Sequence, residues 1–139
     1  EIASVCDLRI AETGSRLGAP VGKLGFPLAL PELAPVLRLL GPALTADLLL
    51  TGRLLSAEEA LGAGVVQRVA GAGDLASVVQ QVIDAVLAGS PLAARLNKRN
   101  LRMLVDQGGR YSDEQLADSF GFFTSSDYAE GMAAFLARR

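Results

Sequence analysis

The sequence of 139 residues contains no histidine and no tryptophan, and Cys6 is its single cysteine. Without histidine the chain cannot carry a Ser-His-Asp or Cys-His nucleophile system, and it lacks the residue that zinc sites use most often. One cysteine cannot form an internal disulfide, which is typical of a reducing compartment. We therefore expect a cytoplasmic protein without a metal site, whose chemistry depends on carboxylates, hydroxyls and backbone N–H groups.

The sequence also has little net charge and no long apolar run. Its formal charge is -2, and its arginines and lysines are spread along the chain, which argues against nucleic acid as a partner. No uninterrupted apolar stretch approaches the roughly 18 residues that span a bilayer, so we expect no membrane partner and no signal peptide. Half of the residues are apolar and 20% are charged, a balance typical of a globular domain. The start without methionine, within an apolar run, predicts a fragment.

The first half of the chain predicts a mixture of strands and helices. Residues 2–12 are expected to form one or two short strands broken near Cys6, because Leu8 and Ile10 alternate with polar residues. Residues 13–31 contain too many glycines and prolines for a regular element and predict a structured loop. Helices are predicted over 32–40 and 43–50, separated by Gly41 and Pro42.

The second half is predicted to be mainly helical. Ser56 and Glu59 have the spacing of a capping box, which predicts a short helix, and residues 65–69 are then expected to form a strand. Apolar spacing predicts four further helices, over about 74–87, 91–106, 112–123 and 127–137. We expect residues 1–73 to form one part of the molecule and residues 74–139 a helical second part.

Several segments, in order along the chain, resemble landmarks of the crotonase family, the enoyl-CoA hydratases and isomerases. They are Glu1-Ile-Ala-Ser-Val-Cys-Asp, Leu17-Gly-Ala-Pro-Val-Gly-Lys-Leu-Gly25, Leu49-Leu-Thr-Gly-Arg53, Ser56-Ala-Glu-Glu-Ala60, Gly64-Val-Val and Glu130-Gly-Met-Ala-Ala-Phe135. The resemblance covers nearly the whole chain but only the family's C-terminal half. It implies an α/β fold, part of a crotonase-like spiral ββα core followed by a C-terminal helical oligomerisation region.

The resemblance implies chemistry on acyl-CoA thioesters, with an oxyanion hole that stabilises an enolate and no cofactor, because coenzyme A is part of the substrate. Glu1 stands at the position of the first catalytic acid of the family. The second acid's position holds Val21, which cannot bind a proton or orient water. We therefore predict weak or absent hydration of simple enoyl-CoAs, and proton transfer such as double-bond isomerisation becomes the leading activity.

The resemblance also assigns residues to the substrate. The predicted acyl pocket consists of Leu17, Gly18, Pro20, Val21, Phe26 and Leu28. Phe26 and Leu28 stand where many relatives have a glycine-rich turn, and ordinary packing of these two side chains is an open alternative. Glu32 could act as a substitute acid, although helix N-termini favour carboxylates in any case. Phe135 and Arg138 match the aromatic and basic pair that helps to hold coenzyme A.

The helices of the last third have wide apolar faces, which predict burial against another surface. The resemblance implies a homotrimer, or a hexamer built from two trimers, assembled through these helices. Two other readings stay open. One is a non-catalytic acyl-CoA-binding homologue, which Val21 favours, and the other is a truncated assembly subunit.

Overall fold

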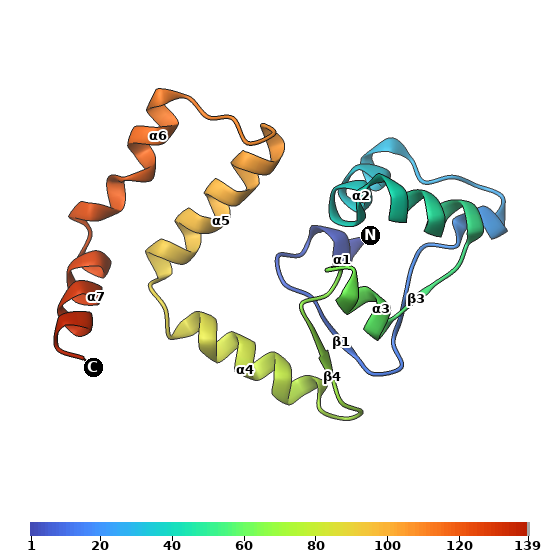
Figure 1. Cartoon of the computed structure of the whole chain (residues 1–139), viewed down its shortest axis with the longest axis horizontal. Helices are drawn as coiled ribbons and strands as arrows, with labels where there is room; N and C mark the ends of the chain where they lie inside the picture. The colour runs from blue at the N-terminus through green and yellow to red at the C-terminus, as the bar shows by residue number, and fades with distance from the viewer. Residues whose placement is uncertain (139) are drawn as a thin grey trace. The chain divides into compact units, whose positions relative to one another are not determined.

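The computed structural model describes residues 1–138, which form two compact units (Figure 1). The first unit is Glu1–Gln80 and the second begins at Gln81, so the division falls within helix α4 (Leu75–Leu87). The predicted boundary at residues 73 and 74 lies directly before this helix. The roles assigned to the two parts stay predictions.

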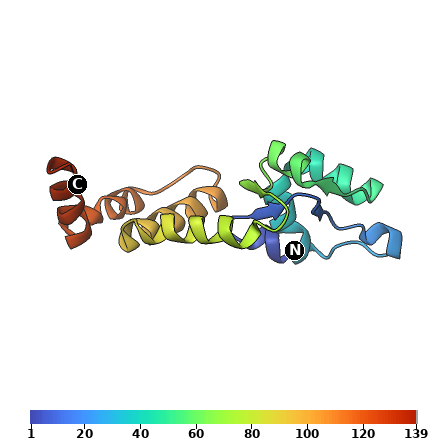
Figure 2. The same ribbon diagram turned by 90° about the horizontal axis from the view of Figure 1, so that it is seen from below.

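The first unit is built from short strands and helices. Its elements are α1 (Ile2–Val5), β1 (Ile10–Glu12), β2 (Arg16–Leu17), η1 (Val21–Leu24), α2 (Leu30–Thr51), β3 (Leu55–Ser56), α3 (Ala57–Gly62) and β4 (Arg68–Ala70). Strands β1 and β4 pair in parallel, with Ala11 opposite Val69, and β2 pairs antiparallel with β3, with Leu17 opposite Leu55. The segment that contains β2 and η1 is largely irregular, as predicted, and projects from the unit in Figure 2.

The prediction of a strand at the start of the chain is wrong for Ile2–Val5, which forms the short helix α1. The amide of Ser4 donates to the carbonyl of Glu1 at 2.9 Å, and the amide of Cys6 donates to that of Ala3 at 3.3 Å. These local hydrogen bonds use the backbone groups that a sheet would need. Only the later part of the predicted segment, β1, forms a strand.

The strand predicted over 65–69 begins later, at Arg68. The amides of Val65 and Val66 both donate to the carbonyl of Ala60, at 2.8 and 3.2 Å, and so terminate helix α3. Both valines are buried in the core of the unit, together with Ala11 and Leu48. Their apolar character therefore reflects burial beside a helix end and not participation in a sheet.

Helix α2 is interrupted at Gly41, whose φ of 71° and ψ of 168° are not helical. The two predicted helices are thus confirmed as two pieces of one segment, and Figure 1 shows the bend. By length and composition α2 could cross a membrane, as could the bent pair of α4 and α5 (Pro91–Asp106) taken together. Each piece of α2 on either side of Gly41 is shorter than the roughly 17 residues that the shortest spanning helices contain. The expected absence of a membrane partner stays a prediction.

The second unit contains the end of α4 and the helices α5, α6 (Asp113–Ser119), η2 (Gly121–Thr124) and α7 (Ser126–Leu136). The helical character and the breaks at Gly89 and Gly108 agree with the sequence. Within residues 81–138, none of these helices contains a buried residue. Large apolar side chains such as Leu101, Phe120 and Phe123 are more than half exposed. The helices therefore present apolar faces that the described chain does not cover.

Candidate active site

A pocket of about 100 Å³ in the first unit brings together three of the residues predicted for the site. Its walls come from α1, the segment after β2, both pieces of α2, strand β3 and the turn after α3. The residues that line it are Glu1, Ala3, Ser4, Leu17, Gly18, Ala19, Val36, Leu39, Leu40, Thr45, Leu48, Leu49, Leu55 and Val65. The lining is mostly apolar, with few polar side chains, as in small-molecule sites, but the volume is below the roughly 300–1,000 Å³ of most ligand pockets.

Glu1 is the N-cap residue of α1 and the sole acid in this lining, as far as residues 1–138 are concerned. Its carbonyl accepts the Ser4 amide at 2.9 Å and the Ser4 hydroxyl at 2.6 Å. These two hydrogen bonds hold the backbone of Glu1, and its carboxylate takes part in neither of them. The predicted catalytic role stays a prediction, but the structure places the residue at the pocket.

Leu17 and Gly18 lie at the same pocket, and strand pairing holds them there. Leu17 is opposite Leu55 in the β2–β3 pair. A Cβ atom on Gly18 would lie 2.7 Å from Cδ2 of Leu54 and 3.1 Å from the carbonyl oxygen of Arg53. Gly18 is therefore the residue that allows β2 to approach the segment leading into β3.

The other predicted pocket residues do not line this cavity. Pro20 precedes η1 and Val21 begins it, and both are partly buried. Phe26 is 51% exposed, whereas Leu28 is buried. Their predicted contacts with an acyl chain stay predictions. The carboxylate of Glu32 accepts a hydrogen bond from the Ala29 amide at 2.9 Å at the start of α2. This contact agrees with a helix-capping role for Glu32.

Thr45 is the pocket residue that the sequence analysis missed. It is only 4% exposed, and its Oγ1 atom has no hydrogen-bond partner in the part of the chain that the structure describes. A helical threonine commonly donates to the carbonyl four residues earlier, which here belongs to Gly41, where the helix breaks. A buried hydroxyl without a partner costs about 1–3 kcal/mol. The sequence feature that could have identified Thr45 is its position one helical turn before Leu48, on the apolar face of α2.

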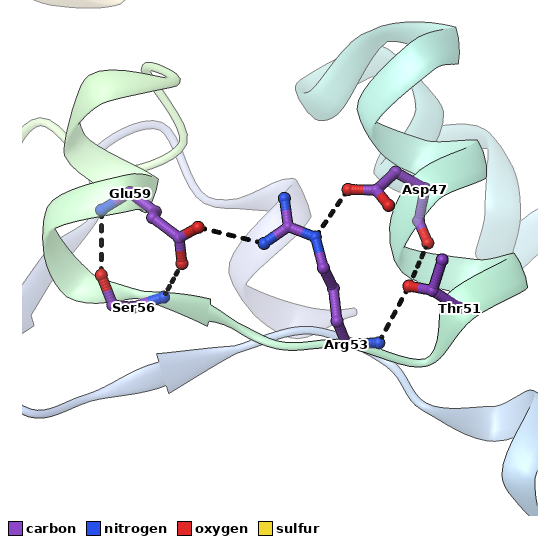
Figure 3. A network of polar contacts seen from close by, with 5 residues as sticks. All are labelled: Asp47, Thr51, Arg53, Ser56 and Glu59. Carbon is purple, nitrogen blue, oxygen red and sulfur yellow. Dashed lines mark hydrogen bonds and ion pairs between the residues drawn. The ribbon is translucent and has the colours of Figure 1, made fainter.

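The wall that contains Leu55 is braced by a polar network around Arg53 (Figure 3). Arg53 Nε donates to Oδ2 of Asp47 at 2.6 Å, and Nη1 donates to Oε1 of Glu59 at 3.1 Å. The predicted capping box is confirmed, because the Ser56 amide donates to Glu59 at 2.8 Å and the Glu59 amide donates to Ser56 Oγ at 3.1 Å. The Ser56 amide, followed by Arg53, lowers the pKa of Glu59, and the bond to Asp47 raises the pKa of Arg53.

The residues predicted to bind coenzyme A lie in the second unit. Phe135, in α7, is 77% exposed, and Arg138 follows the helix with a left-handed φ of 56°. The same unit has a cavity of about 390 Å³ between α5, α6 and α7. At its edge the Asp127 carboxylate accepts the Ser90 hydroxyl at 2.5 Å and the Leu92 amide at 3.2 Å. These bonds, the hydroxyl first, lower the pKa of Asp127.

Known proteins resemble the chain over its whole length. The sequence pattern described as enoyl-CoA hydratase/isomerase matches residues 1–139. A crotonyl-CoA hydratase of Syntrophomonas wolfei is 35% identical over all of this chain and 54% of its own length. A short-chain-enoyl-CoA hydratase of Clostridium acetobutylicum is 27% identical, again over all of this chain and 54% of its own length.

Solved structures agree with the sequence comparisons. The crystal structure of an enoyl-CoA hydratase/carnithine racemase from Magnetospirillum magneticum has a TM-score of 0.91 and 35% identity, over 98% of this chain and 51% of that one. The fold is therefore α/β and crotonase-like, as predicted. The chain spans about half the length of these relatives, and its assignment to their C-terminal half stays a prediction. Its sequence and its fold place the chain in the enoyl-CoA hydratase/isomerase family.

Proposed function

We propose that the full-length protein acts on acyl-CoA thioesters and stabilises a thioester enolate in an oxyanion hole, with Glu1 as the acid/base. The names of the relatives support this substrate class, because they include a crotonyl-CoA hydratase and a carnitinyl-CoA dehydratase. The resemblance implies that the backbone N–H donors of the oxyanion hole lie outside the first unit's pocket, before Glu1 and in the other half of the protein. Each such donor typically contributes about 3–4 kcal/mol to lowering the barrier.

The observation that carries the proposal is the position of Glu1 beside Leu17 and Gly18 in one apolar pocket, while Val21 lies outside its lining. Two-acid hydration needs one carboxylate to activate water and another to handle the proton at the α-carbon. Among the described residues the lining offers one carboxylate only. Proton transfer by a single acid, as in double-bond isomerisation, is the reaction that this lining supports best.

In this reaction the Glu1 carboxylate takes a proton from the α-carbon of a 3-enoyl thioester. The electron pair of the broken C–H bond moves into the enolate, whose oxygen the N–H donors stabilise. The same carboxyl group then returns the proton to the γ-carbon as the double bond forms between the α- and β-carbons. No water is consumed, so the position of Val21 needs no acid.

The test uses the full-length protein with 3-butenoyl-CoA and crotonyl-CoA. We expect isomerisation of 3-butenoyl-CoA, a loss of at least about 100-fold in Glu1→Gln, and little hydration of crotonyl-CoA. Val21→Glu places a carboxylate at the position that the resemblance assigns to the second acid, and the resemblance therefore implies that this variant hydrates crotonyl-CoA faster. If the unmodified protein hydrates crotonyl-CoA at about 1 to 1,000 per second, the range of ordinary enzymes, the inference drawn from Val21 is wrong.

A second candidate is a non-catalytic acyl-CoA-binding protein, which the replacement of an acid by Val21 favours. This candidate predicts binding of butyryl-CoA without turnover of either enoyl substrate. The third candidate, a truncated assembly subunit, predicts no binding at all. Isothermal titration with butyryl-CoA, followed by the turnover assays, separates the three.

The proposed assembly is a homotrimer or a hexamer built through the C-terminal helices. It is supported by the uncovered apolar side chains of α4 to α7, among them Leu87, Leu101 and Phe123. Multi-angle light scattering is expected to give three or six times the mass of the full-length chain. A monomer at micromolar concentration would contradict this proposal. Coenzyme A binding by Phe135 and Arg138 belongs to the same proposal.

A further inference from the structure

Helix α1, which has Glu1 as its N-cap, is not held in the first unit by burial of its side chains. None of its four residues is buried, and Ile2 and Val5 are exposed. The hydrogen bond from the Ser4 amide to the Glu1 carbonyl joins residues of the helix and its cap, and does not attach the helix to the rest of the unit. The position of Glu1 therefore depends on contacts that connect α1 to the core.

Arg9 makes such a connection. Its Nη1 donates to the carbonyl of Cys6, the residue that ends α1, and its Nε donates to the carbonyl of Val65 at 2.6 Å. The backbone of Arg9 is held on the same side, because its amide donates to Oε1 of Gln67 at 2.8 Å and its carbonyl accepts the Gln67 amide at 2.9 Å. One side chain thus joins the end of α1 to the segment that follows α3.

Val65 is a firm anchor for this link. It is buried in the hydrophobic core and lines the pocket that contains Glu1. Its amide donates to the carbonyl of Ala60 at 2.8 Å, so both polar groups of its backbone are engaged. A guanidinium presents its N–H groups in a fixed planar fork, and a charged donor makes stronger hydrogen bonds than a neutral one. Arg9 is therefore suited to fix the end of α1 against one wall of the pocket.

Building on the proposed function, we propose that Arg9 is a positioning residue for Glu1. It acts through α1 and not on the substrate: by holding the Cys6 carbonyl beside that of Val65, it sets where the N-cap of α1 lies in the pocket. Proton transfer needs the carboxylate within hydrogen-bond reach of the proton, and a misplacement of about 1 Å can cost about 100-fold in rate. Loss of Arg9 therefore slows the chemical step while the pocket still binds the acyl group.

The test measures isomerisation of 3-butenoyl-CoA by the full-length protein, expressed per binding site. Isothermal titration with butyryl-CoA gives the dissociation constant and the number of sites, so that a partly unfolded variant is not mistaken for a slow one. We expect Arg9→Ala to lower the rate per site by about 10- to 100-fold with a nearly unchanged dissociation constant. Arg68→Ala is the matched control. It removes an exposed arginine from β4, the strand that pairs with β1, and is expected to keep the rate per site.

Arg9→Lys is a second variant for the case in which Arg9→Ala does not fold. Lysine keeps the charge but lacks the planar fork, so a smaller loss of rate per site is expected. An unchanged rate per site in Arg9→Ala, or in Arg9→Lys if only that variant folds, would overturn the role of Arg9, as would an equal loss in Arg68→Ala. In these cases the unmodified protein still isomerises its substrate, so the proposed function stands. If the unmodified protein does not isomerise 3-butenoyl-CoA, the proposed function fails and the role of Arg9 fails with it.

Discussion

Arg53 Nε lies 2.6 Å from Oδ2 of Asp47, and this contact ties the end of α2 to the segment that leads into β3. The same guanidinium reaches Glu59 in α3, with Nη1 at 3.1 Å from Oε1. One planar cation therefore links two helices across the strand that supplies Leu55 to the pocket. The arrangement depends on the forked geometry of arginine, which a lysine ammonium does not reproduce.

The first prediction concerns this link. Arg53→Ala is expected to lower the melting temperature of the full-length protein, and Arg53→Lys to recover part of the loss, because lysine keeps the positive charge but lacks the planar fork that reaches both carboxylates. All three side chains are partly accessible to solvent, so 1 M NaCl is expected to shrink the difference between Arg53→Ala and the unmodified protein. Equal melting temperatures for the three proteins at low salt would show that the link contributes nothing.

The second prediction concerns Gly18. An alanine Cβ there would meet Leu54 at 2.7 Å and the carbonyl of Arg53 at 3.1 Å, so Gly18→Ala is expected to destabilise the protein by about 1–3 kcal/mol. Urea unfolding measures the loss. Gly62→Ala is the control, because a Cβ on Gly62, at the end of α3, has no neighbour within 4 Å. If both variants lose the same stability, the close approach of β2 is not what Gly18 provides.

The third prediction concerns the stability of Thr45 variants in the absence of ligand. Thr45→Val replaces a buried, unpaired hydroxyl by a methyl group of similar size and is expected to raise the free energy of unfolding by about 1 kcal/mol. Thr45→Ser keeps the hydroxyl but removes a methyl group, so it is expected to lower that free energy. A Thr45→Val protein less stable than the unmodified one would mean that the hydroxyl has a partner in the full-length protein.

The fourth prediction concerns pH. The Ser90 hydroxyl and then the Leu92 amide hold the pKa of Asp127 below its ordinary value of about 3.9. A carboxyl group whose pKa is lower in the folded state stabilises the fold above its unfolded pKa, and this contribution is lost as the pH falls through the folded pKa. The melting temperatures of Asp127→Asn and the unmodified protein should therefore differ most near pH 7 and converge below about pH 4.

Ser90→Ala provides the control for this pH dependence. It removes the hydroxyl that bonds Asp127 at 2.5 Å, and also the cap to the Ala93 amide at 3.0 Å. The first loss depends on pH and the second does not. We expect the pH-dependent part to shrink in Ser90→Ala while a constant difference remains. A difference between Asp127→Asn and the unmodified protein that is the same at pH 3 and pH 7 would contradict the assignment.

Local signals in the sequence predicted the helical elements well. Gly41 followed by Pro42 indicated the break in α2, and Ser56 with Glu59 indicated the start of α3, because glycine torsions and capping boxes depend on a few adjacent residues. The prediction of a strand over Ile2–Val5 was wrong. Ile2 and Val5 have β-forming side chains, but the backbone of this segment makes its hydrogen bonds to residues three positions away. Such competition between local and distant partners is invisible in a single sequence.

The candidate site was predicted in part. The resemblance indicated Glu1, Leu17 and Gly18, which the fold brings to one pocket from α1 and from the end of β2. Thr45 was missed because a threonine within an apolar helix has no motif of its own. Its hydroxyl is unpaired because of two facts of the fold, the loss of its usual acceptor at Gly41 and the burial of the residue.

Gly41 has a consequence for the shape of the pocket. Positive φ combined with ψ near 180° is a region that essentially glycine alone occupies. Leu39 and Leu40 line the pocket from one side of this bend, and Thr45 and Leu48 line it from the other. A single pair of torsion angles thus sets the spacing between two walls that belong to one segment. The cavity therefore lies on the inner side of the bend in α2. Its width depends on the torsion angles of Gly41, which is not itself in the lining.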